Sequence, residues 1–174
     1  AKYAYYVTRY VNNDETQIHV DNTYRQQEMY FSTSNVYEIL SKWSVSMSYD
    51  FKWNKLNANM VDFAFPHRYS NFVSLATALT LSRIQAQASV VEQVVKDHVK
   101  YGMSSPSRST LTPAFFVNVY PFNSKLLAVR AFAKKSFRMP TFNDLYYAEM
   151  GNSKLNPESA LQYDLGFVLN KDWK

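Results

Sequence analysis

The chain has 174 residues, the length of one ordinary domain, of which 47% are hydrophobic and 17% aromatic. It contains no Cys, which excludes disulfide frameworks, thiolate metal sites and Cys nucleophiles. The formal net charge of +5 is mild and the positive charges form no long run, so nucleic acid is not an expected partner.

The mean hydropathy of -0.36 and the absence of any run of about 18 consecutive apolar residues argue against a membrane-spanning helix. A membrane β-barrel is still allowed, because each of its strands turns only every second residue toward lipid. The chain opens with AKYAYYVTRYV, which has the pattern of a strand and not that of a signal peptide. We therefore expect that any leader has been removed upstream of this chain.

The first expected strand covers Tyr3 to Val11. Its alternation is imperfect, because Arg9 falls on the same face as Tyr3 and Val7. Two explanations are open. Either Arg9 lies at the level of the lipid headgroups, or the strand register slips at Tyr10.

The clearest pattern lies between Lys42 and Asn54, after a less regular strand near residues 24–36. In KWSVSMSYDFKWN, apolar and aromatic residues occupy every second position and polar residues stand between them. A strict period of two predicts a strand, because a helix would scatter both groups around its axis. The length exceeds the usual ~5–6 residues of a soluble strand and reaches the ~9–11 residues that a membrane-spanning strand needs. A long strand in a soluble sandwich is the alternative, and its apolar face would then need a second sheet to cover it.

Two tryptophans stand at the ends of this apolar face. The roughly ten residues between Trp43 and Trp53 extend over about 33 Å of strand. Tilted by ~40°, such a strand rises about 25 Å, which is the spacing between the two aromatic girdles of an outer-membrane barrel. We therefore expect Trp43 and Trp53 to mark the two edges of the lipid-facing band.

Further strands are expected near residues 71–81, 84–97, 111–120, 125–135 and 160–169. The segment Ile84 to Lys100 is ambiguous, because its apolar residues fit a helical stripe as well as a period of two. We expect a strand there because the neighbouring segments are strands.

The lengths of the connections alternate along the chain. Short connections are expected at residues 37–41, 82–83 and 121–125, and long ones at 12–23, 55–70, 98–109 and 136–157. Short turns at one end and long loops at the other are typical of outer-membrane barrels, whereas a sandwich mixes lengths with Greek-key crossings. The sequence therefore predicts an all-β fold: an antiparallel up-and-down meander of about eight long strands that forms part of a transmembrane β-barrel.

The charged residues of these strands lie mainly opposite the apolar face. Charge on the lipid face at the bilayer midplane costs roughly 2–4 kcal/mol, so this segregation is expected of a barrel. The charged residues that we expect to face inward are Lys42, Asp50, Lys52, Arg130, Lys134 and Asp164.

The segment SFRMPTFNDLYYAEMGNSKLNPESALQYDLGF, residues 136–167, resembles a hallmark stretch of TonB-dependent outer-membrane receptors. In that family a strand ends in Arg-x-Pro and is followed by a Leu-Tyr segment, Gly-Asn, Leu-x-Pro-Glu and the next strand. The matching residues are Phe137, Arg138, Pro140, Leu145, Tyr146, Gly151, Asn152, Leu155, Pro157, Glu158 and Gly166. Upstream, WNKLNA at 53–58 and RAFAKKSFR at 130–138 resemble receptors common in Bacteroidetes, and the whole looks closer to the siderophore and cobalamin branch than to the glycan-importing branch.

The resemblance implies a function in nutrient import. The parent protein would lie in the cell outer membrane, contact its lipid, carry a plug domain, and receive energy from TonB to import a small nutrient such as a siderophore or cobalamin. The family has a plug and a larger barrel that are not found here. Residues 1–174 are therefore expected to be a partial domain, an internal fragment of the barrel.

The motif residues also have local physical explanations, so we expect them to be mainly structural. Pro140 lacks an N–H and would end the ladder of the preceding strand. Thr141 and Asp144 could cap a short helical turn in residues 142–148. Gly151 with Asn152 would allow a positive φ, and Pro157 would start the returning strand.

A possible basic strip facing the lumen consists of Arg130, Lys134 and Arg138. We expect these side chains to pair with plug carboxylates or to solvate the channel wall. Attraction of an anionic ferric chelate is the alternative role.

The sequence contains few patterns of His, carboxylate or Ser residues that would indicate catalysis or a bound cofactor. His19, His67 and His98 lie far apart in or near expected loops, with no spacing that places two on one face, so no metal site is expected. The carboxylates form no close inward pair for acid–base work, and the serines alternate with apolar residues without a nucleophile elbow. We expect no catalytic residue and no cofactor. Two other hypotheses are kept: an outer-membrane barrel enzyme of the protease or lipase kind, and a soluble β-sheet ligand-binding or adhesion protein.

Overall fold

The computed structural model describes residues 1–12, 20–122, 126–147 and 151–170. Its strands form one antiparallel sheet in which each strand pairs with its neighbours in the sequence, in the order β1 to β8. The strands are β1 (Lys2–Asn12), β2 (Val20–Leu40), β3 (Trp43–Ala58), β4 (His67–Thr80), β5 (Ile84–His98), β6 (Arg108–Val119), β7 (Leu127–Arg138) and β8 (Glu158–Leu169). One short helix, α1 (Phe142–Tyr146), lies between β7 and β8. The all-β meander is confirmed, and the ambiguous segment after Ile84 is a strand.

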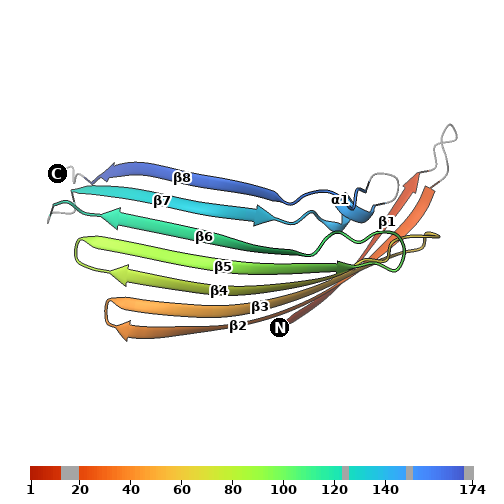
Figure 1. Ribbon diagram of the computed structural model, residues 1–174, viewed down its shortest axis with the longest axis horizontal. Coiled ribbons are helices and arrows are strands. Elements are labelled where there is room, and N and C mark those ends of the chain that lie inside the picture. Colours follow the sequence, from red (N-terminus) through yellow and green to blue (C-terminus); the bar gives the residue numbers. More distant parts are fainter. Residues whose placement is uncertain (13–19, 123–125, 148–150, 171–174) are drawn as a thin grey trace.

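The two ends of the sheet differ as expected. Short turns join β2 to β3 and β4 to β5 at one end, whereas the longer connections and α1 lie together at the other (Figure 1). The β2–β3 turn is tighter than predicted, because β2 continues to Leu40 with a register shift between Glu38 and Leu40. Part of the expected turn at 121–125 lies outside the described residues. The long-loop end is the end that an outer-membrane barrel turns to the outside of the cell.

The strands extend further at the long-loop end than the alternation predicts. β2 has 21 residues and β3 has 16, and β3 and β4 are joined by residues 59–66 instead of 55–70. The reason is that backbone pairing continues after the apolar alternation has ended. Asn57, for example, still pairs with Arg25 of β2. An apolar pattern marks only the part of a strand that needs an apolar face.

The first strand contains no register slip. Its pairing with β2 is continuous from Lys2 opposite Tyr30 to Asn12 opposite Val20, so the slip proposed at Tyr10 is wrong. Arg9 instead binds Asp21 of β2 through two contacts, Nε to Oδ1 at 2.7 Å and Nη2 to Oδ2 at 2.6 Å. A carboxylate partner makes the guanidinium acceptable on this face.

The register assigns residues to the two faces, because cross-strand partners share a face. Trp43 pairs with Leu79, which pairs with Ala86, and this row continues on the apolar face. Five of the expected inward charges lie in strands, on the opposite face, whereas Lys42 lies in the β2–β3 turn. Several charged side chains depart from the expected segregation and share the apolar face. Glu92 and Lys135 lie within the apolar band, and those at the long-loop end are Arg9, Asp21, Arg25, Lys55 and Lys96.

Little of this sheet is covered by protein on either side. Large apolar side chains stay exposed along the apolar face, including Met47 at 53%, Leu75 at 51% and Leu165 at 76%. The buried cluster lies only at the long-loop end and comprises Tyr24, Leu56, Phe63, Phe142, Leu145 and Tyr146. A sheet that leaves its apolar band bare needs lipid, not a second protein layer, to cover it. None of the described helices is long and apolar enough to cross a membrane.

Candidate functional site

The connection between β7 and β8 folds back against the sheet through α1. Thr141 is the N-cap of this helix: its Oγ1 accepts a hydrogen bond from Asp144 N at 3.3 Å, and its N donates to Asp144 Oδ2 at 2.8 Å. These bonds form the reciprocal capping box that the sequence predicts, although the helix ends at Tyr146, before the expected limit. The hydrogen bonds from Thr141 hold the pKa of Asp144 below its ordinary value.

A buried ion pair lies beneath this helix. Arg68 of β4 and Asp97 of β5 are cross-strand partners, with exposed fractions of 9% and 6%. Arg68 Nε lies 2.7 Å from Asp97 Oδ1, and Arg68 Nη2 lies 2.8 Å from Asp97 Oδ2. This two-point geometry is the strong form of an arginine–carboxylate contact. Such a pair is buried at low cost only if its remaining hydrogen-bonding capacity is also satisfied.

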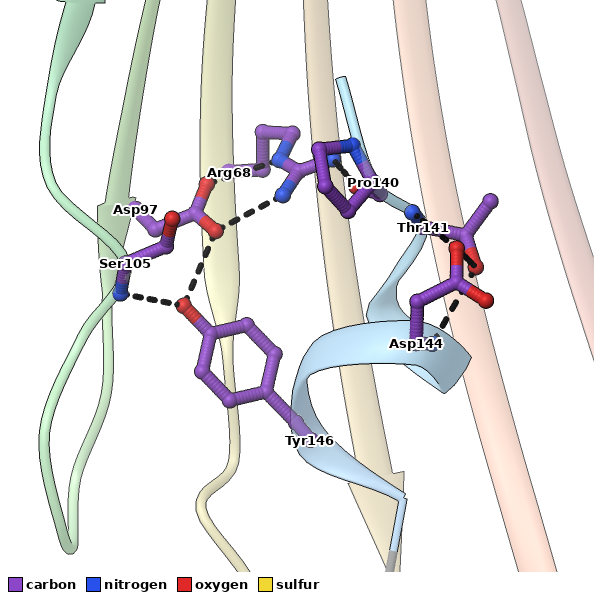
Figure 2. A network of polar contacts seen from close by, with 7 residues as sticks. All are labelled: Arg68, Asp97, Ser105, Pro140, Thr141, Asp144 and Tyr146. Atoms are coloured by element: carbon purple, nitrogen blue, oxygen red, sulfur yellow. Dashed lines mark hydrogen bonds and ion pairs between the residues drawn. The ribbon is translucent and has the colours of Figure 1, made fainter. Parts of the chain in front are cut away.

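The long loops supply those remaining hydrogen bonds (Figure 2). Arg68 Nη1 donates to the Pro140 carbonyl at 2.7 Å, and the Tyr146 hydroxyl donates to Asp97 Oδ2 at 2.9 Å. Ser105 N, in the β5–β6 connection, donates to the Tyr146 hydroxyl at 2.9 Å. Burial raises the pKa of the Tyr146 hydroxyl, and the charge of Asp97 acts in the same direction. We call Arg68, Asp97, Ser105, Pro140 and Tyr146 the anchor network.

Aromatic contacts complete the attachment of α1. The Arg68 guanidinium lies 5.1 Å from the centroid of the Phe142 ring, which is within the range of a cation–π contact. Leu145 is 2% exposed and belongs to the buried cluster. The anchor network and this cluster therefore fix two long connections to the inward face of the sheet.

Gly151 has a different explanation from the predicted one. The positive-φ glycine among the described residues is Gly102, and Gly151 is not in that conformation, so the expected positive φ is wrong. Its N donates to the Tyr147 carbonyl at 2.8 Å, and an added Cβ would lie 2.6 Å from Tyr147 N. A side chain is excluded there by close approach of the backbone.

The remaining motif residues shape the return to β8. Asn152 N donates to the Asp144 carbonyl at 2.9 Å, and Leu155 N donates to the Asn152 carbonyl at 3.1 Å. Pro157 directly precedes β8. Arg138 and Glu158 are cross-strand partners whose exposed side chains approach to 3.7 Å.

The possible basic strip lies along one face of β7. Arg130 pairs with Asn118 and with Gly166, and Lys134 pairs with Ala114 and Gln162 on the inward face. The Nε atom of Arg130 lies 3.3 Å from where a Cβ would stand on Gly166, so the guanidinium packs across that glycine. The three basic side chains are therefore aligned as expected, and their role stays a prediction.

Trp43 and Trp53 lie at different heights on the apolar face. Trp43 is the first residue of β3, and its indole Nε1 donates to Thr77 Oγ1 at 2.8 Å. Trp53 lies near the other end, with its ring 6.1 Å from that of His67. Their role as a membrane girdle likewise stays a prediction.

A polar hollow of about 350 Å³ opens on the inward face beside α1. Glu28 is one of the residues that line it. Its Oε2 lies 2.9 Å from Lys52 Nζ and accepts a hydrogen bond from Asn54 Nδ2 at 2.9 Å. Arg68 and the first residues of α1 also line it. The hollow therefore combines charged groups of both signs with the anchored loop.

Sequence reasoning missed the anchor network and misjudged the histidines. His67 and His98 are direct cross-strand partners, so the expectation that they lie far apart is wrong, while His19 lies outside the described residues. Within the described ranges, no group of three His, Asp or Glu side chains could hold a metal ion. Arg68 and Asp97 each lie on the inward face near the end of a strand. Only the two positions taken together could have predicted the ion pair.

A meander with an apolar outer band, a polar inner face and loops gathered at one end defines an outer-membrane β-barrel wall. Comparison with known proteins makes the assignment specific. A sequence model of the family "TonB dependent receptor-like, beta-barrel" matches residues 1–174, and the chain belongs to this family. Its members are outer-membrane receptors and not enzymes, which removes the barrel-enzyme and soluble-protein hypotheses.

A solved structure supports the fold. The chain is similar to a structure described as "Copper transporter OprC", with a TM-score of 0.65 and 14% identity, covering 98% of this chain. The chain spans 32% of the length of that protein. No curated protein sequence matches the chain.

Proposed function

We propose that the protein containing this chain imports a scarce nutrient across the outer membrane with energy relayed through TonB. The substrate class that we propose is a metal chelate such as a siderophore, or cobalamin, as in the branch that the motif resembles. Membership of the receptor family carries the proposal. The chain would supply barrel wall and extracellular loops, and it would perform no bond chemistry.

The anchored loop supports a specific contribution to import. Residues 140–146 are fixed on the inward face by the anchor network, beside the hollow that contains Glu28 and Lys52. A fixed loop gives the outer mouth of the barrel a defined shape before the nutrient arrives, which lowers the entropic cost of binding. We propose that this hollow contacts either the nutrient or the plug domain of the same parent chain. The small share of the similar structure that the chain covers supports a parent with further strands.

The contacts of the basic strip favour a structural role in the barrel wall over a role in substrate binding. Arg138 approaches Glu158 and Arg130 packs across Gly166, so both side chains have contacts within the wall. We propose that Lys134, with these two, solvates the inner wall or pairs with plug carboxylates.

Growth with a single nutrient source tests the function. A strain lacking the full-length receptor should fail to grow when a ferric siderophore or cobalamin is the limiting source, and the restored gene should recover growth only when TonB is present. Lys52→Gln should weaken uptake severalfold if the hollow contacts the nutrient, and Lys42→Gln, in the β2–β3 turn, is the matched control. Normal growth of the deletion strain on every chelate and on cobalamin would overturn the proposed substrate class.

A further inference from the structure

A cluster of basic side chains lies on the outward face of the sheet, at the long-loop end. Lys55 of β3 is the cross-strand partner of His67, and His67 is the partner of His98. Lys96 shares this face in the adjacent row, opposite Tyr69. With Lys100, which follows β5, these side chains form what we call the outer basic cluster: Lys55, His67, Lys96, His98 and Lys100.

Four of the five members of the cluster line a hollow of about 420 Å³. Lys55, His67, His98 and Lys100 line it, and none of the described residues in its wall carries a carboxylate. The carboxylate nearest in sequence, Asp97, points to the inward face, where it is held by Arg68. The hollow is therefore a concave, positively charged surface that lacks its own counter-ion.

Aromatic rings lie directly around this charge. Trp53 and Tyr69 lie in the same row as Lys96. The Trp53 ring lies 6.1 Å from that of His67, and the Tyr69 ring lies 5.9 Å from that of His98. On the loop side, the Lys100 ammonium lies 5.0 Å from the centre of the Tyr101 ring. Aromatic side chains gather where a barrel meets the membrane–water interface. The charge thus begins where the apolar band ends.

The position and the charge together select the ligand. Because the long loops face the outside of the cell, the cluster lies at the headgroup level of the outer leaflet. We propose that the outer basic cluster binds the phosphate groups of a phosphorylated lipid headgroup in that leaflet. Lysine ammonium groups would balance the phosphate charge, and imidazole N–H groups would donate to its oxygens. A nutrient entering the barrel would pass the other face of the sheet, so the cluster is separate from the proposed import path.

Lipid retention by the purified full-length receptor tests this site. The receptor would be extracted in detergent, washed, and exposed to a bisphosphorylated lipid A or to the same lipid without phosphates, with bound lipid measured by native mass spectrometry. The wild type should retain the phosphorylated lipid preferentially. Each lysine near such a surface changes binding by about fivefold, so Lys55→Gln, Lys96→Gln and Lys100→Gln together should reduce retention at least about tenfold.

The matched control removes three lysines elsewhere: Lys42 in a turn, Lys134 on the inward face and Lys154 in a loop. It should retain lipid as the wild type does, and nutrient uptake by the outer-cluster variant should stay normal, so that failure of this proposal is distinguishable from failure of the proposed function. Equal retention of both lipids, or an unaffected outer-cluster variant, would overturn the proposal. Full displacement of the lipid by millimolar inorganic phosphate would also overturn it, because the site would then recognise free phosphate.

Discussion

At the scale of single residues, the Arg68–Asp97 pair governs the attachment of the long loops. Its two charges are almost fully buried and share hydrogen bonds with Pro140 and Tyr146. Losing one partner of such a pair is far more damaging than losing both, because the remaining charge is left buried without compensation. This asymmetry can be measured.

Asp97→Asn should loosen α1 by about 3–5 kcal/mol, because it leaves the Arg68 guanidinium buried without a counter-ion. Tyr146→Phe removes only the hydroxyl that links Asp97 to Ser105, and should cost about 1–3 kcal/mol. Hydrogen exchange of the backbone amides in α1, in the full-length receptor, reports the free energy of local opening.

The paired substitution is the control for this prediction. Arg68→Met combined with Asp97→Leu removes both charges and should restore much of the protection that Asp97→Asn alone loses. If Asp97→Asn leaves the exchange of α1 unchanged, the ion pair does not hold the loop.

Residues differ in how far their roles could be foreseen. Thr141 and Asp144 form a capping box whose partners are three positions apart, so the local sequence is sufficient to predict it. Arg68 and Asp97 lie on different strands and meet a helix that follows much later in the chain. Their contact depends on the register of the whole sheet, which no local pattern specifies. The pairing of His67 with His98 was missed for the same reason.

At the scale of elements, the strand is the unit that the sequence specifies best. The alternation alone predicts β3, and two residues of its apolar face, Trp43 and Met47, are exposed, as expected of a lipid-facing row. Its far end extends further than the alternation predicts, because backbone pairing beyond the apolar band does not need apolar side chains. Alternation therefore reports the solvent that each face meets, and not the limits of hydrogen bonding.

A pair of neighbouring substitutions tests the assignment of faces. Met47→Arg places a charge on the lipid side between the levels of Trp43 and Trp53 and should destabilise the folded barrel by roughly 2–4 kcal/mol. Ser46→Arg places the same charge on the inward face, where Ser46 borders an open hollow, and should cost much less. Urea unfolding of the full-length receptor in lipid vesicles measures both. Equal destabilisation by the two variants would contradict the assignment.

At the scale of the whole molecule, the sheet combines two environments along one set of strands. Between the levels of Trp43 and Trp53 the outward residues are mainly apolar, with Glu92 and Lys135 as charged exceptions. Beyond Trp53 the same face carries Lys55 and His67. The fold class was predictable because this alternation repeats in strand after strand. Curvature, closure and substrate were not, because they depend on contacts between segments distant in the sequence.

The height of the sheet in the bilayer is the remaining property that the two tryptophans predict. Because this chain contains no Cys, single nitroxide labels can be introduced by Trp43→Cys, Met47→Cys and Trp53→Cys in a full-length receptor freed of other reactive thiols. Depth measured by relaxation with lipid-soluble oxygen and a water-soluble nickel chelate should be greatest at Met47. Labels at the two tryptophan positions should lie at the opposite headgroup regions, about 25 Å apart along the bilayer normal. A label at position 53 as deep as the one at position 47 would show that the apolar band, and the outer basic cluster above it, are placed at the wrong height.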